Sequence, residues 1–422
     1  MHAIHRYVPA YAILSMAAVL IVPISTLEPL WLTIIAALAA LAAMVEHGGR
    51  DAWPRTQRML SLLMAALVVW GAASVIWSLS PERSVSQAFK LLLFAAGATV
   101  LVSLASGIDP AGRRQIERFL IIGFAIGISF VIFELLTSGF VHSALNGFYF
   151  NKSAGQEFSR AMNLFHLNRS SSVISLMVWV TIIPVWRRFG AFVSGALILI
   201  SAYAIWGLQP SAPLIAIFAS AGVFVLAWLF PRFVPVILGA MVFAFLLMFP
   251  ILSVLEISIS GFFDNAGLSD FSTNHRMAIW QFASDHAISR PFMGWGLDSS
   301  RLIGMDQIVT LYDAPHVGFR DVDVLPLHPH NALLQAWLEL GFVGATIVAG
   351  LFAAVILNIA YNVQGRIERA AAYAAFTAAF VTAQLSFGSW QGWWLSTLAL
   401  VAVLIIALVS PPRADAYTSG RA

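Results

Sequence analysis

Long apolar stretches are the sequence feature that most constrains how this chain folds. A membrane-spanning helix needs ~20 mostly apolar residues, and about twelve stretches approach that length. They cover residues 8–27, 29–45, 60–78, 87–106, 118–138, 170–186, 190–207, 211–230, 233–255, 332–360, 370–387 and 391–410. We therefore predict an all-α polytopic membrane protein with about twelve transmembrane helices and a large loop between the ninth and tenth.

The composition supports this fold class and narrows the chemistry. Hydrophobic residues make up 60% of the 422 residues and charged residues 10%, whereas a soluble domain has ~25% charged residues. The net charge of +3 is small and the basic residues are scattered, so nucleic acid is not an expected partner. The absence of cysteine excludes thiol nucleophiles and thiolate metal sites. Chemistry must come from His, carboxylate, Arg or hydroxyl groups.

The N-terminal residues 1–24 combine a short basic region with an apolar run, as a signal peptide does. No small-x-small cleavage site precedes a polar segment, and a second apolar run follows almost at once. We predict a retained first span.

The basic residues predict the orientation of the spans. If the N-terminus is cytoplasmic, the connections on that side hold fourteen of the 23 Lys and Arg residues, as the positive-inside rule requires. The fourteen are Arg6, Arg50, Arg55, Arg58, Arg113, Arg114, Arg118, Arg187, Arg188, Arg232, Arg366, Arg369, Arg413 and Arg421. Two long connections on the opposite side, residues 139–169 and 256–331, hold seven of the other nine Lys and Arg residues. Such long connections are usually functional or disordered. Because these two are also rich in Trp, Phe and Gly, we expect them to fold and to pack on each other.

The predicted organisation has three parts. Residues 1–255 form about nine spans with the loop 139–169, residues 256–331 form the long loop expected to carry the site, and residues 332–422 form three spans and a tail. Within the long loop, Asn274 can cap a helix that continues to about Ser289. One face of this helix would carry Met277, Trp280, Ala283, Ser284 and Ile288, and the other would carry Gln281 and Asp285.

His330 is the sharpest candidate for chemistry. In the sequence HPHNALLQAW, Asn331 can act as the N-cap of the tenth span, which places His330 just before the first turn. The positive end of a helix dipole disfavours imidazolium. His330 should therefore stay neutral near pH 7, as a general base must.

Five arginines in the two long connections are candidates to bind phosphate: Arg160, Arg169, Arg276, Arg301 and Arg320. A guanidinium offers rigid bidentate donors that match phosphate geometry. Arg276 and Arg169 lie at the edge of the apolar layer, where a cation is a functional candidate by default. The alternative for each is snorkelling to lipid headgroups, which we favour for Arg301 and Arg320.

Other polar and aromatic residues of the long loop give weaker signals. Asp321 and Asp323, with His328 nearby, resemble an Asp-x-Asp metal motif, but such pairs are common in acidic loops, and we predict no metal and no cofactor. Trp280 could stack on a sugar, although core packing is the commoner role of a tryptophan. His328 and Asn331 are further candidates to bind substrate.

The order of these residues resembles the O-antigen ligase and O-antigen polymerase superfamily of bacterial membrane glycosyltransferases. The family pattern, over about 70 residues, matches Arg276, Trp280, Pro291, Gly294, Gly296, His330, Asn331, Gln335, Glu339, Gly341 and Gly344. The segment FHLNRSS resembles an earlier Asn-Arg site of the family, at Asn168 and Arg169. Many members also carry a Ser-Arg pair at the start of the span corresponding to 211–230, where this chain has QPSAPL, with Ser211 and no Arg.

The resemblance implies a multi-pass protein of the bacterial inner membrane with a periplasmic site and no metal. It implies transfer of a glycan from undecaprenyl pyrophosphate to a sugar hydroxyl, with Arg276 and Arg169 as the pyrophosphate clamp. The acceptor is lipid A core for a ligase and another lipid-linked glycan for a polymerase. The shared motifs do not separate these activities, and we favour the ligase. A lipid-linked glycan transporter is the alternative outside the enzyme class, but transporters place their polar groups at the bilayer midplane.

Overall fold

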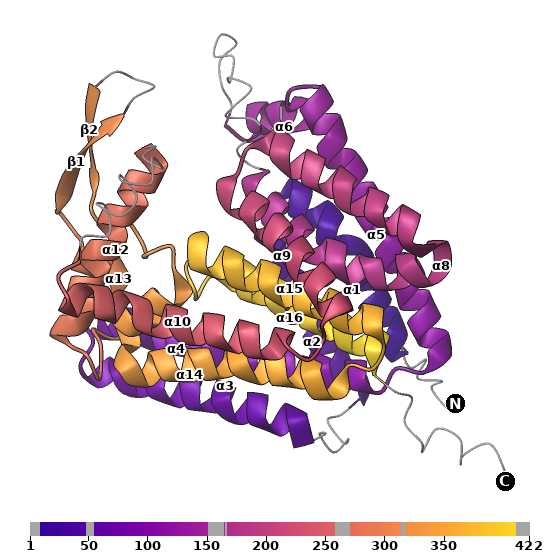
Figure 1. The fold of residues 1–422 in the computed structure, drawn as a ribbon, viewed down its shortest axis with the longest axis horizontal. Helices are drawn as coiled ribbons and strands as arrows, with labels where there is room; N and C mark the ends of the chain where they lie inside the picture. The colour runs from indigo at the N-terminus through magenta and orange to yellow at the C-terminus, as the bar shows by residue number, and fades with distance from the viewer. Residues whose placement is uncertain are drawn as a thin grey trace, which may run out of the picture.

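The structure is a computed structural model that describes residues 9–47, 55–150, 164, 167–257, 271–313 and 318–410. Figure 1 shows long helices lying side by side, with a small extension built from α12 and a two-stranded sheet. The elements are α1 (Ala10–Leu27), α2 (Trp31–His47), α3 (Arg55–Ala73), the 3₁₀ turn η1 (Ser74–Ile76), α4 (Pro81–Ser106), α5 (Pro110–Leu136), α6 (Phe140–Phe150), α8 (Asn168–Leu208), α9 (Ser211–Leu229), α10 (Val234–Val254), α12 (Phe271–Ser289), α13 (Ser300–Ile303), β1 (Ile308–Asp313), β2 (Gly318–Asp323), α14 (Ala332–Asn362), α15 (Arg366–Leu385) and α16 (Gly392–Val409).

Every predicted apolar stretch is helical. Two of the helices are interrupted: α8 at Gly190, where φ is 79°, and α14 at Gly341, where φ is 66°. The break in α8 separates the two stretches that the sequence divides at residues 187–189. Among the described residues, nine helices are long and apolar enough to cross a membrane, and α2 is a shorter apolar helix. A helical polytopic membrane protein is thus confirmed, whereas the number of crossings stays a prediction.

Small residues bring the helices of the bundle close together. Helix α1 packs along α5, and α15 packs against α8 and α9. A Cβ atom added to Gly123 of α5 would lie 2.5 Å from the Val19 carbonyl oxygen, and one added to Gly127 would lie 2.3 Å from a Val22 side-chain carbon. Glycines four residues apart form one close-packing stripe on a helix. These two allow α1 and α5 to meet at backbone distance.

Polar residues of separate connections meet at one end of the bundle. Arg187, near the break in α8, pairs with Glu117 of α5 at 2.7 Å and with Glu368 of α15 at 3.0 Å. Arg113 donates to the Ala407 carbonyl at the end of α16. The charge distribution placed these connections on the same membrane side, and their mutual contacts agree with that arrangement.

The long connection between α10 and α14 contains strands that the all-α prediction did not include. Strands β1 and β2 pair antiparallel, with Ile308 opposite Asp323 and Leu311 opposite Arg320. Their β-branched and aromatic residues favour extended structure. The predicted contact between this loop and residues 139–169 falls largely on residues outside the described ranges.

Helix α12 begins one turn earlier than predicted, so Asn274 lies inside the helix and is not its N-cap. A tertiary contact supports this first turn, because the guanidinium of Arg320 on β2 lies 5.4 Å from the Phe271 ring. Of the predicted apolar face, Met277, Trp280, Ala283 and Ser284 are buried and Ile288 is partly buried.

Candidate active site

The site is built around the first nine residues of α14, which end at the break at Gly341. The carbonyls of the three residues before Gly341 accept hydrogen bonds from other segments. Their donors are the Trp295 N–H at 3.0 Å, the Gly296 N–H at 2.8 Å and the Trp70 indole at 2.9 Å. Carbonyls freed by a helix break need such partners. The chain after α12 therefore closes the end of this short helical segment.

The glycines of the sequence motif allow this docking. A Cβ atom on Gly294 would lie 2.5 Å from the Glu339 backbone, one on Gly341 would lie 2.3 Å from the Phe292 carbonyl, and one on Gly296 would lie 2.4 Å from the Ser78 side chain. All three glycines have positive φ, which is costly for other residues. Their contribution is close backbone packing between the loop and α14.

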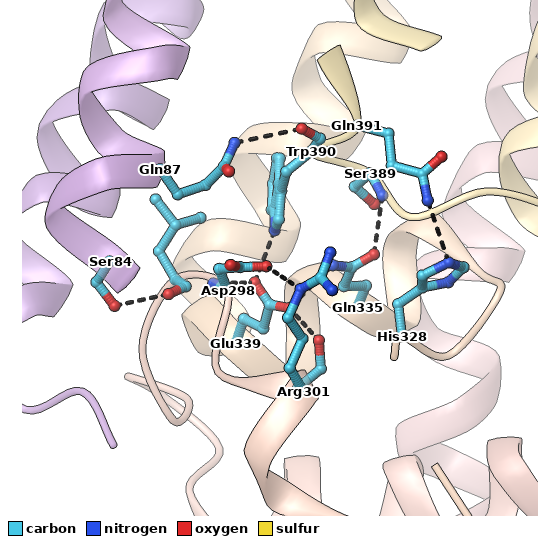
Figure 2. A network of polar contacts seen from close by, with 12 residues as sticks. Ser84, Gln87, Asp298, Arg301, His328, Gln335, Glu339, Ser389, Trp390 and Gln391 are labelled. Atoms are coloured by element: carbon cyan, nitrogen blue, oxygen red, sulfur yellow. Dashed lines mark hydrogen bonds and ion pairs between the residues drawn. The ribbon is translucent and has the colours of Figure 1, made fainter. Parts of the chain in front are cut away.

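Glu339 is the centre of a buried polar network, shown in Figure 2. Its carboxylate is fully buried and accepts from the Asp298 N–H at 2.6 Å and from the Trp390 indole at 2.6 Å. The Gln335 amide, at 2.9 Å, and the Ser300 hydroxyl also donate to it. A buried carboxyl group is tolerated when it is fully hydrogen-bonded. Glu339 thus joins α14, the 298–301 segment and the α15–α16 connection.

His330 is held in a strained backbone conformation directly before α14. Its φ is 54°, a left-handed value that costs a residue with a side chain about 1–2 kcal/mol. Asn331 caps α14, as predicted, by accepting from the Leu334 N–H at 3.0 Å, and the Trp280 indole donates to the Pro329 carbonyl at 2.9 Å. Strain of this kind persists where the surroundings fix it, and it is frequent at functional sites.

The contacts of His330 define its tautomer. Nδ1 lies 2.5 Å from the Ser386 carbonyl oxygen, which can only accept, so Nδ1 carries the proton and Nε2 keeps its lone pair. Burial lowers the pKa of His330 from 6.5, and its electrostatic interactions with Arg276 and His275 lower it further, against the opposing effect of the Ser386 carbonyl. The imidazole is therefore neutral at pH 7. Burial, rather than the helix dipole alone, is the main cause.

His328 contacts His330 through its ring. Its ring is buried and its centroid lies 4.3 Å from that of His330. Nδ1 of His328 accepts from the His330 N–H at 3.2 Å. Burial, with the nearby His330 and Arg301, lowers the pKa of His328 to about 3. Gly388 leaves room for this ring, because a Cβ atom there would lie 2.9 Å from it.

Two of the predicted arginines lie near the histidines. Arg276, half-buried on α12, is close enough for its charge to lower the pKa of His330. Arg301 acts in the same way on His328, and its Nε lies 3.2 Å from the Asp298 carboxylate, with the side chain 37% exposed. Each histidine of the His328–His330 pair thus has a positively charged side chain near it.

The other predicted cations are placed differently. Asn168 and Arg169 form the first turn of α8, where the Arg169 side chain is exposed and, among the described residues, makes no hydrogen bond or ion pair. Arg320 is exposed on β2 against the Phe271 ring. Arg160 lies outside the described residues. The structure therefore places Arg276 and Arg301 near the two histidines. A position close to the histidines for Arg160, Arg169 and Arg320 stays a prediction.

Trp280 and the Asp-x-Asp pair take structural positions. The Trp280 ring is 7% exposed and packs edge-on against Phe249 at 5.4 Å. It holds Pro329 and offers no face for a sugar. Asp321 accepts from Thr310 across the hairpin at 2.6 Å. Within the described ranges, no three His, Cys, Asp or Glu side chains are grouped as metal ligands.

Sequence reasoning did not identify several residues that build the site. Ser386 contributes a backbone carbonyl 56 positions from His330, and no side-chain pattern reports such a contact. Glu339 stood in the family motif without an assigned role. The segment AQLSFGSWQG ends an apolar stretch and contains several polar residues. These polar residues were the sequence signal that could have identified the α15–α16 connection as part of the site.

The fold and site define a polytopic membrane protein with a neutral, tethered histidine and adjacent arginines where a helix begins. The family model described as "O-Antigen ligase" matches residues 196–349. A Rickettsia felis protein named "Putative polysaccharide ligase" is 28% identical over 348 residues, 81% of this chain and 79% of its own length. One of the same name from Rickettsia bellii is 26% identical over 354 residues, 81% of this chain and 78% of its own length. These matches confirm the resemblance to the O-antigen ligase superfamily.

Proposed function

We propose that this protein is an O-antigen ligase-type glycosyltransferase of the bacterial inner membrane. It moves a glycan from undecaprenyl pyrophosphate to a sugar hydroxyl of lipid A core at the periplasmic face. The observation that carries the proposal is the hydrogen bond from His330 Nδ1 to the Ser386 carbonyl. This bond leaves Nε2 as a base beside the charge of Arg276. The description of the matching family as O-antigen ligase and the name polysaccharide ligase of the relatives favour a ligase over a polymerase.

In the proposed reaction the oxygen of the acceptor hydroxyl attacks the anomeric carbon of the glycan. The bond from that carbon to the pyrophosphate oxygen breaks, and its electron pair stays on the leaving pyrophosphate. The proton of the hydroxyl passes to His330 Nε2 and then to solvent. Arg276 and Arg169 stabilise the charge that develops on the leaving group, with Arg301, Arg320 and Arg160 as further contacts. Asn331, Asn168 and His328 contribute to substrate binding, and no metal takes part.

The direct test is reconstitution of the purified protein in liposomes with a glycan on undecaprenyl pyrophosphate. Each of two acceptors, lipid A core and a second lipid-linked glycan, is supplied separately. We expect glycosylated lipid A core, released undecaprenyl pyrophosphate and a rate that is unchanged by EDTA. Products formed only on the lipid-linked glycan would identify a polymerase instead. Absence of transfer to either acceptor would contradict the proposed activity, and loss in EDTA that Mg²⁺ restores would contradict the metal-free reaction.

A further inference from the structure

Two buried amide side chains meet at the first turn of α14. Asn331 Oδ1 accepts from the Leu334 N–H at 3.0 Å, and Gln384 Oε1, from the last turn of α15, accepts from the neighbouring Leu333 N–H at 3.3 Å. Asn331 is fully buried and Gln384 is 1% exposed. A residue 51 positions away thus shares in the capping of this helix.

The two capping contacts fix the orientation of both amides. Each oxygen faces a backbone N–H of α14, so each nitrogen, with two N–H donors, is directed elsewhere. Among the described residues, neither Asn331 Nδ2 nor Gln384 Nε2 has a hydrogen-bond partner. Buried donors without partners are costly and rare, and each one needs an explanation. Two of them at one helix N-terminus point to an acceptor that binds there.

The neighbouring groups indicate the chemistry of that acceptor. Asn331 follows His330 directly, and Ser386, whose carbonyl holds the His330 ring, lies two residues after Gln384. The nearby charge is positive, from Arg276 and from the N-terminus of α14. A helix N-terminus with additional N–H donors is a typical binding site for a phosphate oxygen.

We propose that the amide nitrogens of Asn331 and Gln384 form a two-donor site for a phosphate oxygen of the lipid-linked glycan donor. This inference rests on the proposed function and adds Gln384 to the residues that bind the donor. This site lies at the start of α14, directly after His330, where a phosphate oxygen would accept from both nitrogens. Once bound, it places the pyrophosphate beside His330.

The test uses Gln384→Glu and Asn331→Asp in the purified full-length protein. Each change keeps the capping oxygen and replaces the donor nitrogen with an acceptor. Thr382→Val is the matched control: Thr382 Oγ1 is also buried without a partner in the described part of the chain, but a position two residues away lies on the opposite side of α15. Gln384→Met provides a neutral variant if the glutamate prevents folding.

The probes are undecaprenyl pyrophosphate without sugars and the same lipid carrying the glycan. We expect each variant to bind both lipids at least about tenfold more weakly, whereas Thr382→Val binds like wild type. Wild-type affinity of folded Gln384→Glu or Gln384→Met for the sugar-free lipid would overturn the proposal, and so would a loss confined to the glycan-bearing lipid. A wild-type protein that neither binds these lipids nor transfers glycan would contradict the proposed function itself.

Discussion

At the scale of single residues, the site depends on how His330 is held. Its φ is 54°, and its ring is hydrogen-bonded to the Ser386 carbonyl. His328 accepts from the His330 N–H, and Trp280 holds the preceding carbonyl. Contacts from three different segments thus maintain one unfavourable backbone conformation, which gives the base a single orientation.

The pH dependence of transfer follows from the pKa of His330. Protonation removes the lone pair of Nε2, so the rate falls as the pH drops through this pKa. Because burial and Arg276 lower the pKa from 6.5, we expect kcat/KM to be constant from pH 7 to 8 and to fall with a midpoint below 6.5. A profile that rises through a midpoint above pH 7 would be incompatible with His330 in this role. Size-exclusion chromatography at each pH separates this effect from unfolding.

Residue-scale sequence reasoning succeeded where the determinants are local. The sequence HPHN placed His330 before a helix and Asn331 at its cap, because capping depends on neighbours three residues apart. It did not find Ser386 or Gln384, since their contacts join distant parts of the chain. The position of Trp280 on the apolar face followed from helical spacing, and the Phe249 contact explains why its ring packs in the core.

At the scale of elements, the important unit is the short helical segment of α14 and the loop docked at its end. The segment from Pro291 to Gly296 provides N–H donors to the carbonyls before Gly341, and the Pro291 carbonyl accepts from the Phe342 N–H at 2.7 Å. The Pro and Gly positions of the family motif therefore have a structural explanation. They join α12, which carries Arg276, to α14, which follows His330.

Gly341→Ala tests this junction. The substitution forces a side chain into positive φ and places Cβ 2.3 Å from the Phe292 carbonyl carbon. We expect a loss of about 3 kcal/mol in the free energy of unfolding, from backbone strain and overpacking together. Thermal unfolding in detergent measures it. Gly239→Ala on α10 is the control, because nothing lies within 4 Å of a Cβ there. Equal thermal stability of the two variants would contradict the packing role of Gly341.

The sequence predicted helices better than it predicted the long loop. Spans are recognisable because apolar length and periodicity are properties of each segment. The β-hairpin depends instead on pairing between two strands, and the first turn of α12 is contacted by Arg320 of β2 through Phe271. Asn274, the expected cap, lies inside this helix.

At the scale of the whole molecule, the polar side chains that form the ion-pair network and those that form the site lie in two separate regions. The network of Arg187, Glu117 and Glu368 links connections that the charge rule assigns to the cytoplasm. His330, Arg276 and the hairpin belong to the connection assigned to the opposite side. The apolar bundle between them keeps these regions apart.

The chain contains no cysteine, so cysteines that are introduced one at a time and labelled can test this topology. Ser272→Cys on α12 and Ala111→Cys on α5 replace exposed residues without changing charge. In intact cells with a permeable outer membrane, an impermeant maleimide should label Cys at position 272 and should label position 111 only after the inner membrane is disrupted. Labelling in the reverse order would invert the orientation and contradict a periplasmic site.

The central claim is that His330 is the base for glycan transfer. Single-turnover transfer by purified His330→Ala, compared with wild type and with His286→Gln on α12, tests it most directly. General base catalysis contributes about 10²–10⁴-fold, so we expect His330→Ala to be at least about 100-fold slower while remaining folded and able to bind the donor. His286→Gln should keep the wild-type rate. Transfer by folded His330→Ala within about twofold of wild type would contradict the claim.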